Sequence, residues 1–174
     1  KYYTPGTELY DILTIHSRMV AERAVAICDR HPELHADRRF VWESAMLHDI
    51  GIIRTDAPGI YCHGTDHYLR HGLLGAEMLR AEGLPRHARV AERHTGTGLT
   101  IEQIRDRQLP LPLQDFSPET IEEQIVCYAD KFYSKGKPNG ERVQLEQAKS
   151  PDQVLRSLLR FGEDTAQRFL HWQQ

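Results

Sequence analysis

The stretch AMLHDIG at residues 45–51 joins an apolar helical turn directly to a charged pair, His48 and Asp49. Val41 and Leu47 precede the pair at helical spacing, so the histidine and the carboxylate continue the face that this pattern buries. A buried carboxylate without a partner costs several kcal/mol. The stretch therefore predicts a helix whose buried end carries functional groups.

Helical signals dominate the whole chain. Apolar residues recur at spacings of three and four, and capping residues, prolines and glycines mark where the segments begin and end. We predict helices over 7–27, 37–50, 67–82, 85–94, 117–134 and 151–170. No segment alternates with a period of two, and the LPLPL stretch at 109–113 is typical of an extended loop.

These elements predict an all-α fold, a single compact helical bundle over residues 1–174. A length of 174 residues suits one hydrophobic core. We expect that core over about 7–135, with a C-terminal helix at 151–170 packing on it.

The composition argues against several classes of partner. The chain has 22 Lys and Arg against 25 Asp and Glu, a net charge of -3, so we expect neither a nucleic-acid polymer nor an anionic membrane surface as partner. No apolar run approaches the roughly 20 residues that span a bilayer. Cys28, Cys62 and Cys127 show no C-x-x-C spacing, which indicates reduced thiols in a cytoplasmic protein. The first residue is Lys1 and not a methionine, which indicates a trimmed chain.

Five predicted helices carry a histidine or a carboxylate where the pattern expects an apolar residue. One such histidine is more often a hydrogen-bonded core residue than a metal ligand, and a buried carboxylate can pair with Arg or Lys. A single metal cluster explains all five together, because a cation offsets the desolvation of carboxylates and orients neutral imidazoles. The predicted ligands are His16, His48, Asp49, His71, His94 and Asp130.

The types of ligand narrow the choice of metal. Imidazoles and carboxylates without a thiolate suit iron or manganese better than a structural zinc, although magnesium, nickel, cobalt and zinc stay open. Six ligands are too many for one ion that must keep positions free for water and substrate. We therefore expect two divalent ions bridged by a carboxylate, an arrangement that suits phosphoryl transfer.

The 45–51 motif, with His16 before it and Asp130 in the sequence YADK at 128–131 after it, resembles the HD phosphohydrolase superfamily and its HDIG subgroup. The resemblance implies one metal site made by His16, His48, Asp49 and Asp130. It further implies that His71 and His94 hold a second ion and that Asp49 bridges the two, as the catalytic carboxylate.

Within the superfamily, the chain is most similar to bacterial HD-type hydrolases that split diadenosine tetraphosphate symmetrically. The similarity lies in HGLLGA at 71–76 and in His94 followed by Thr95. Two features depart from that family: KFYSK follows Asp130, and the interval from His94 to Asp130 is longer. The lysine that often follows the HDIG motif is replaced by Ile52, and Arg54, two positions on, is the candidate substitute.

The expected function is that of a metal-dependent phosphohydrolase. Metal-activated water would cleave a phosphoester or phosphoanhydride of a nucleotide, a dinucleotide or a similar small molecule. Arg54, Thr95 and Lys131 are the predicted substrate-binding residues, and Arg70 and Lys135 are further candidate phosphate ligands. Lys131 adjoins Asp130, although helical geometry turns consecutive side chains about 100° apart.

Two alternatives stay open at this point. A few families of the HD fold resemble this order of ligands and are di-iron oxygenases. A non-catalytic regulatory module that keeps its metal is the second alternative. Nothing in the sequence predicts an oligomeric state.

Overall fold

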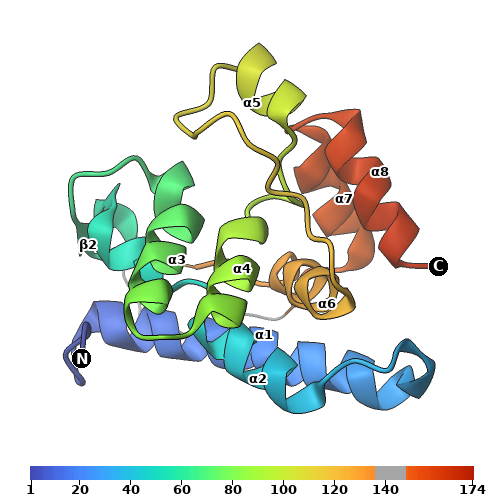
Figure 1. Ribbon diagram of the computed structural model, residues 1–174, viewed down its shortest axis with the longest axis horizontal. Helices are drawn as coiled ribbons and strands as arrows, with labels where there is room; N and C mark the ends of the chain where they lie inside the picture. The colour runs from blue at the N-terminus through green and yellow to red at the C-terminus, as the bar shows by residue number, and fades with distance from the viewer. Residues whose placement is uncertain (136–147) are drawn as a thin grey trace.

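The computed structural model describes residues 1–135 and 148–174. The predicted all-α fold is confirmed, because α-helices account for most of these residues. The α-helices are α1 (Glu8–Arg30), α2 (Arg38–Leu47), α3 (His71–Ala81), α4 (Pro85–Arg93), α5 (Ile101–Asp106), α6 (Ile121–Asp130), α7 (Pro151–Leu159) and α8 (Glu163–Trp172) (Figure 1).

The long helix α1 forms the base of the bundle. It packs against α2 and α6, while α3 and α4 form a hairpin that contacts α2 and α6 through α4. Apolar side chains of four helices fill the space between them, among them Val20 of α1, Val41 of α2, Val90 of α4 and Val126 of α6. In Figure 1, α1 and α2 lie below the other helices.

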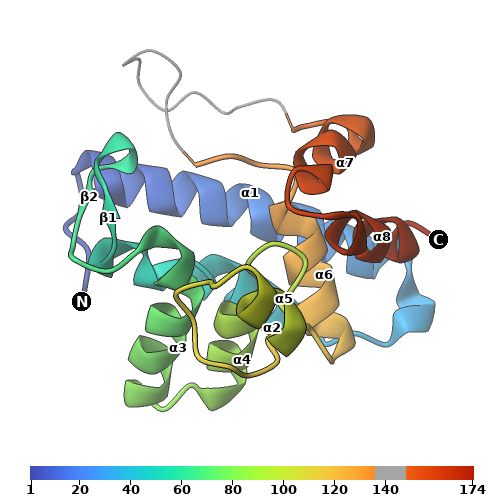
Figure 2. The same ribbon diagram turned by 90° about the horizontal axis from the view of Figure 1, so that it is seen from above.

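The C-terminal helices α7 and α8 pack beside the end of α6. A second apolar cluster joins them there, made by Phe132, Val154, Leu158, Ala166 and Phe169. Figure 2 shows the two helices beside α6, on the side away from α3.

The prediction of one C-terminal helix over 151–170 is wrong, because two helices occupy this stretch. Gly162 separates them with a φ of 124°, a conformation that residues with a Cβ rarely adopt. The glycine turns the chain so that α8 folds back on α7.

Several other helix ends differ from the predictions: α1 continues to Arg30, and α3 begins at His71. The helix expected over 117–134 begins at Ile121, because Thr120 and Glu123 form a reciprocal capping box that outcompetes the signal at Ser117. The helix expected over 37–50 ends at Leu47. The earlier end of α2 places His48 and Asp49 just beyond it, and Asp130 is terminal because α6 ends there and not at 134.

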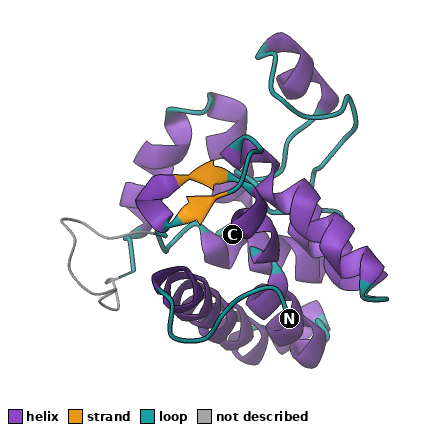
Figure 3. Ribbon diagram, turned by 90° about the vertical axis from the view of Figure 1, so that its left-hand side faces the viewer, coloured by secondary structure: helices purple, strands orange, loops and turns teal. Residues whose placement is uncertain are grey.

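The loop between α2 and α3 is more ordered than the sequence indicates. It contains the 3-10 helices Ile50–Arg54, Pro58–Ile60 and Tyr68–Arg70, and a two-stranded antiparallel sheet of β1 (Asp56–Ala57) and β2 (Cys62–His63) (Figure 3). Strands of two residues are too short for a period of two to be detected. Among the described residues, no helix is both long and apolar enough to cross a membrane.

Candidate metal centre

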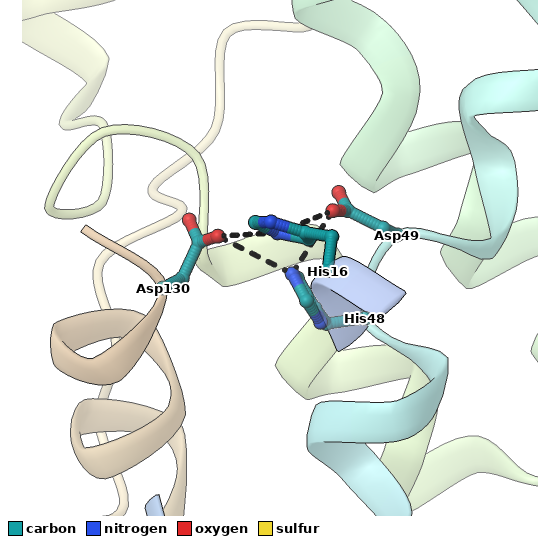
Figure 4. Close-up of side chains that lie close together, drawn as sticks. All are labelled: His16, His48, Asp49 and Asp130. Atoms are coloured by element: carbon teal, nitrogen blue, oxygen red, sulfur yellow. Dashed lines mark hydrogen bonds and ion pairs between the residues drawn. The ribbon is translucent and has the colours of Figure 1, made fainter. Parts of the chain in front are cut away.

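The six predicted ligands lie together in the interior as two groups that share one residue. His16, His48, Asp49 and Asp130 form the first group, and Asp49, His71 and His94 form the second. Within each group the potential ligand atoms lie within 4.8 Å of one another, and all six side chains are buried. Figure 4 shows the first group converging from separate segments of the chain.

Helix ends position most of these side chains. His48 and His94 are the C-terminal cap residues of α2 and α4, His71 is the first residue of α3, and Asp130 is the last residue of α6. Only His16 lies inside a helix, on the buried side of α1. The apolar pattern thus indicated burial correctly, while the arrangement around helix ends emerged only from the structure.

Three imidazoles are oriented by the backbone of the preceding helical turn. Nδ1 of His48, His71 and His94 lies 2.6, 2.7 and 2.6 Å from the carbonyl oxygen three residues earlier. An N–H at Nδ1 donates to that oxygen, so the lone pair is at Nε2 in the neutral ring. In its neutral form each of these histidines therefore presents an unprotonated Nε2 to the cluster, as a metal ligand must.

The contacts inside the cluster call for a cation. Nε2 of His71 lies 2.9 Å from Nε2 of His94, so two lone pairs face each other when both Nδ1 atoms carry the proton. Among the described residues, Nε2 of His48 and both carboxylate oxygens of Asp49 make no hydrogen bond of acceptable geometry, although ion-pair contacts surround them. Buried polar atoms left in this state are costly, and a divalent cation would satisfy them together. The donor set therefore fits a metal.

Burial and neighbouring charges set the protonation states. Burial lowers the pKa of His71 to about 3, with help from His94, and keeps the ring neutral. Burial also lowers the pKa of His48, but Asp49 and Asp130 outweigh it and raise that pKa to about 9. Two carboxylates that attract a proton at this nitrogen would equally attract a metal ion.

Both carboxylates are ionised. Burial raises the pKa of Asp49 and Asp130, but nearby cations outweigh it and hold both pKa values well below the usual range. His48 and Lys135 act on Asp49, and Lys131 and Lys135 act on Asp130. Acceptor-only oxygens are thus directed at the cluster.

Two glycines let the histidine-bearing segments approach each other. At Gly51 an added Cβ would lie 2.1 Å from the carbonyl oxygen of His71, and at Gly72 it would lie 2.5 Å from that of Ala91. Side chains at these positions would push α3 away from the 45–51 motif and from α4. The motif glycine therefore brings Nε2 of His71 to 3.4 Å from Oδ1 of Asp49.

Lys131 contacts the cluster directly. Its Nζ donates to Oδ2 of Asp130 at 2.7 Å and to the carbonyl oxygen of His94 at 3.0 Å. The backbone of Lys131 is still helical, with a φ of -63° and a ψ of -21°, but its long side chain curls back and reaches the carboxylate of Asp130. Lys131 therefore links the two ligand groups.

A cavity of about 760 Å³ lies beside the cluster. His71, His94, Asp130 and the predicted Thr95 line it, and its basic side chains are Arg107, Lys131, Lys135, Lys149 and Arg160. Apolar side chains form other parts of the wall, including Leu69, Leu99, Leu109, Val154 and Phe161. The cavity thus combines a cationic lining with an apolar wall.

Two predicted phosphate-binding arginines do not reach this cavity lining. Arg54 forms a half-exposed ion pair with Glu77 at 2.9 Å, and Arg70 lies 3.6 Å from Asp66. The structure therefore places Arg54 apart from the other predicted substrate-binding residues, Thr95 and Lys131.

Sequence reasoning missed two supporting side chains. The thiol of Cys127 donates to the carbonyl oxygen of His94 at 3.4 Å, and the ring of Tyr68 stacks on His71 with centroids 4.7 Å apart. Tyr68 could have been found from its position three residues before His71, because this spacing brings its carbonyl oxygen to Nδ1–H of His71. Cys127 carried no such signal.

Known proteins share much of the sequence of this chain. Two tRNA (cytidine(56)-2'-O)-methyltransferases, from Picrophilus torridus and Thermoplasma volcanium, are each 38% identical to the chain, over 125 and 138 residues. These matches cover 71% and 79% of the chain but 32% and 35% of the relatives, so the chain spans about a third of their length. An uncharacterized protein of Methanocaldococcus jannaschii is 37% identical over 120 residues, which are 67% of the chain and 63% of that protein.

A solved structure shows the same fold. The HD domain of the L. monocytogenes phosphodiesterase PgpH superposes with a TM-score of 0.53 and 20% identity, over 97% of this chain and 86% of that one. None of these proteins is named as a diadenosine tetraphosphate hydrolase, so that subtype stays a prediction. Residues 13–134, which contain all six predicted ligands, match the HD domain model, and the chain therefore belongs to the HD domain family.

Proposed function

We propose that the protein is a metal-dependent phosphohydrolase that cleaves a phosphoester or phosphoanhydride of a nucleotide or a similar small phosphorylated molecule. One observation carries the proposal. Four imidazoles and two ionised carboxylates converge in the interior at the edge of a cavity that five basic side chains line. Cations around a metal cluster suit a substrate with several negative charges.

The ligands divide naturally between two ions. His16, His48, Asp49 and Asp130 would hold one divalent ion, and Asp49, His71 and His94 a second, so catalysis would depend most on Asp49. Iron and manganese suit these donors best. When bound, such ions lower the pKa of a water molecule towards neutrality and neutralise charge on phosphoryl oxygens.

The remaining cavity residues would hold the substrate and support the ligands. Thr95 offers a hydroxyl next to His94, and Lys131 would keep Asp130 in place at the wall of the cavity. Leu69, Leu99 and Phe161 provide apolar contact for a group such as a nucleobase.

The names of two relatives widen the choice of substrate. Because those tRNA methyltransferases share about a third of their length with this chain, ribonucleotides and RNA fragments belong among the candidates. A net charge of -3 favours these small molecules over intact tRNA.

Metal analysis of the purified protein followed by a substrate panel tests the proposal. The panel contains nucleoside phosphates, dinucleoside polyphosphates, cyclic dinucleotides and short oligoribonucleotides, and the readout is phosphate or nucleotide release. Asp49→Ala is expected to abolish both metal binding and activity. His31→Ala is the matched control, because His31 is exposed and pairs only with Glu33 among the described residues.

Two results would contradict the proposal. Full activity of a metal-free Asp49→Ala protein would end it. Oxygen uptake with a mixed-valent EPR signal, in the absence of phosphate release, would replace it with the di-iron oxygenase alternative.

A further inference from the structure

Lys135 contacts the shared carboxylate of the metal centre without belonging to the ligand set. Its Nζ lies 2.6 Å from Oδ2 of Asp49, and its side chain is only 11% exposed. It also lines the cavity. A buried ammonium group at this distance neutralises a carboxylate that would otherwise be costly to bury.

The contact places two cations in competition for one oxygen. Oδ2 of Asp49 lies 3.1 Å from Nε2 of both His16 and His48, so it belongs to the same donor group as these nitrogens. A divalent ion held by this group and the ammonium of Lys135 would repel each other strongly at such short range. Lys135 and such an ion would therefore compete for Asp49.

The cavity is the available destination. Lys135 already lines it, whereas Lys131 is committed to Asp130 and to the His94 carbonyl oxygen. The position that follows the HDIG motif brings no cation, since Ile52 is fully buried in an apolar cluster and Arg54 pairs with Glu77.

We propose that Lys135 competes with the metal for Asp49 and, once released from it, binds a phosphate group of the substrate. The first half concerns the metal alone, and the second half rests on the proposed function. The lysine thereby lets the buried carboxylate remain ionised, and it supplies a cation to the cavity as the metal binds.

The two halves predict opposite effects of one substitution. In Lys135→Ala, Mn²⁺ is expected to bind about tenfold more tightly, because the competing cation is gone. Inorganic phosphate is expected to bind the Mn²⁺-loaded variant about tenfold more weakly, because one charged contact is lost. A residue that merely supported the fold would weaken both interactions.

Isothermal titration calorimetry measures both constants, first with Mn²⁺ added to chelator-treated protein and then with inorganic phosphate added to loaded protein. Lys135→Arg retains the charge and is expected to restore phosphate binding. Lys149→Ala is the matched control for metal binding, because Lys149 lines the same cavity and forms no ion pair with Asp49 or Asp130 among the described residues. Circular dichroism checks the fold, and Lys135→Met, which keeps the apolar stem, replaces the alanine variant should it unfold.

The outcomes separate this inference from the proposed function. Unchanged or weaker Mn²⁺ binding in Lys135→Ala overturns the competition, and unchanged phosphate binding overturns the second role. A failure of the proposed function looks different, since the unmodified protein would then bind Mn²⁺ and release no phosphate from any substrate.

Discussion

The metal centre and the outer wall of the cavity are held together by different means. In the metal centre, backbone carbonyl oxygens orient three histidines, and glycines set the distances between segments. In the outer wall, formed by α5, α7 and α8, an apolar cluster around Phe169 joins α7 and α8 to the end of α6, and half-exposed ion pairs such as Arg107 with Asp164 link α8 to the end of α5. The family match ends at residue 134, before α7 and α8. We therefore expect the ligand cluster to determine which reaction takes place and the outer wall to determine which substrate binds.

The strongest test of the centre is Gly51→Ala. The added Cβ would meet the backbone of α3 at 2.1 Å, so the helix has to shift. We expect a loss of about 2–4 kcal/mol in the free energy of unfolding, together with weaker binding of the ion near His71. Urea denaturation and metal analysis measure the two effects.

Gly59→Ala is the control for this substitution, because nothing lies within 4 Å of its added Cβ. We expect a change of at most about 0.5 kcal/mol there. Equal stability of the two variants would contradict the role of Gly51 in spacing the centre.

Lys131→Ala tests the link between the two ligand groups. The variant loses the ammonium group that donates to Asp130 and to the His94 carbonyl oxygen. Removing a hydrogen-bond partner of a metal ligand typically lowers activity by about 10–100-fold, so we expect kcat/KM to fall by about that factor. Steady-state kinetics at saturating Mn²⁺ measures the fall, and Lys131→Arg should recover part of it. An unchanged kcat/KM would show that Asp130 needs no such support.

Arg168→Ala tests the outer wall. Arg168 of α8 donates to the carbonyl oxygens of Thr97 and Gly98, in the loop that follows His94. We expect a higher KM, unchanged metal content and a loss of about 1–3 kcal/mol in stability. Arg156→Ala, an exposed change on α7, is the control. Loss of metal from the Arg168 variant would show that the outer wall also supports metal binding, which contradicts the separation of the two regions.

Arg54→Ala is expected to have the smallest effect. Its ion pair with Glu77 is half exposed, and such pairs contribute at most about 1 kcal/mol. Thermal unfolding and KM should both stay close to those of the unmodified protein. A large increase in KM would instead support the sequence-based prediction that Arg54 binds the substrate.

The sequence indicated which polar side chains gather in the interior far better than which side chains form the cavity wall, for physical reasons. Burying a carboxylate such as Asp130 is costly, so an acid on an apolar face stands out in a single sequence. The contact between Lys135 and Asp49 depends on how the chain leaves α6, and no local pattern records it. Gly162 illustrates the same limit, since its positive φ splits a continuous helical pattern in two.

The use of carbonyl oxygens to orient His48, His71 and His94 has a consequence for how this protein can change over time. A carbonyl group is the same in every amino acid, so the orienting contacts themselves do not depend on which side chains stand at positions 45, 68 and 91. Packing does restrict these positions, because Ala45 and Ala91 are fully buried and the ring of Tyr68 stacks on His71. Inserting or deleting one residue between a carbonyl and its histidine would rotate the ring out of the cluster. The orientation of these three rings therefore depends on the length of the local chain more than on the side chains that supply the carbonyl oxygens.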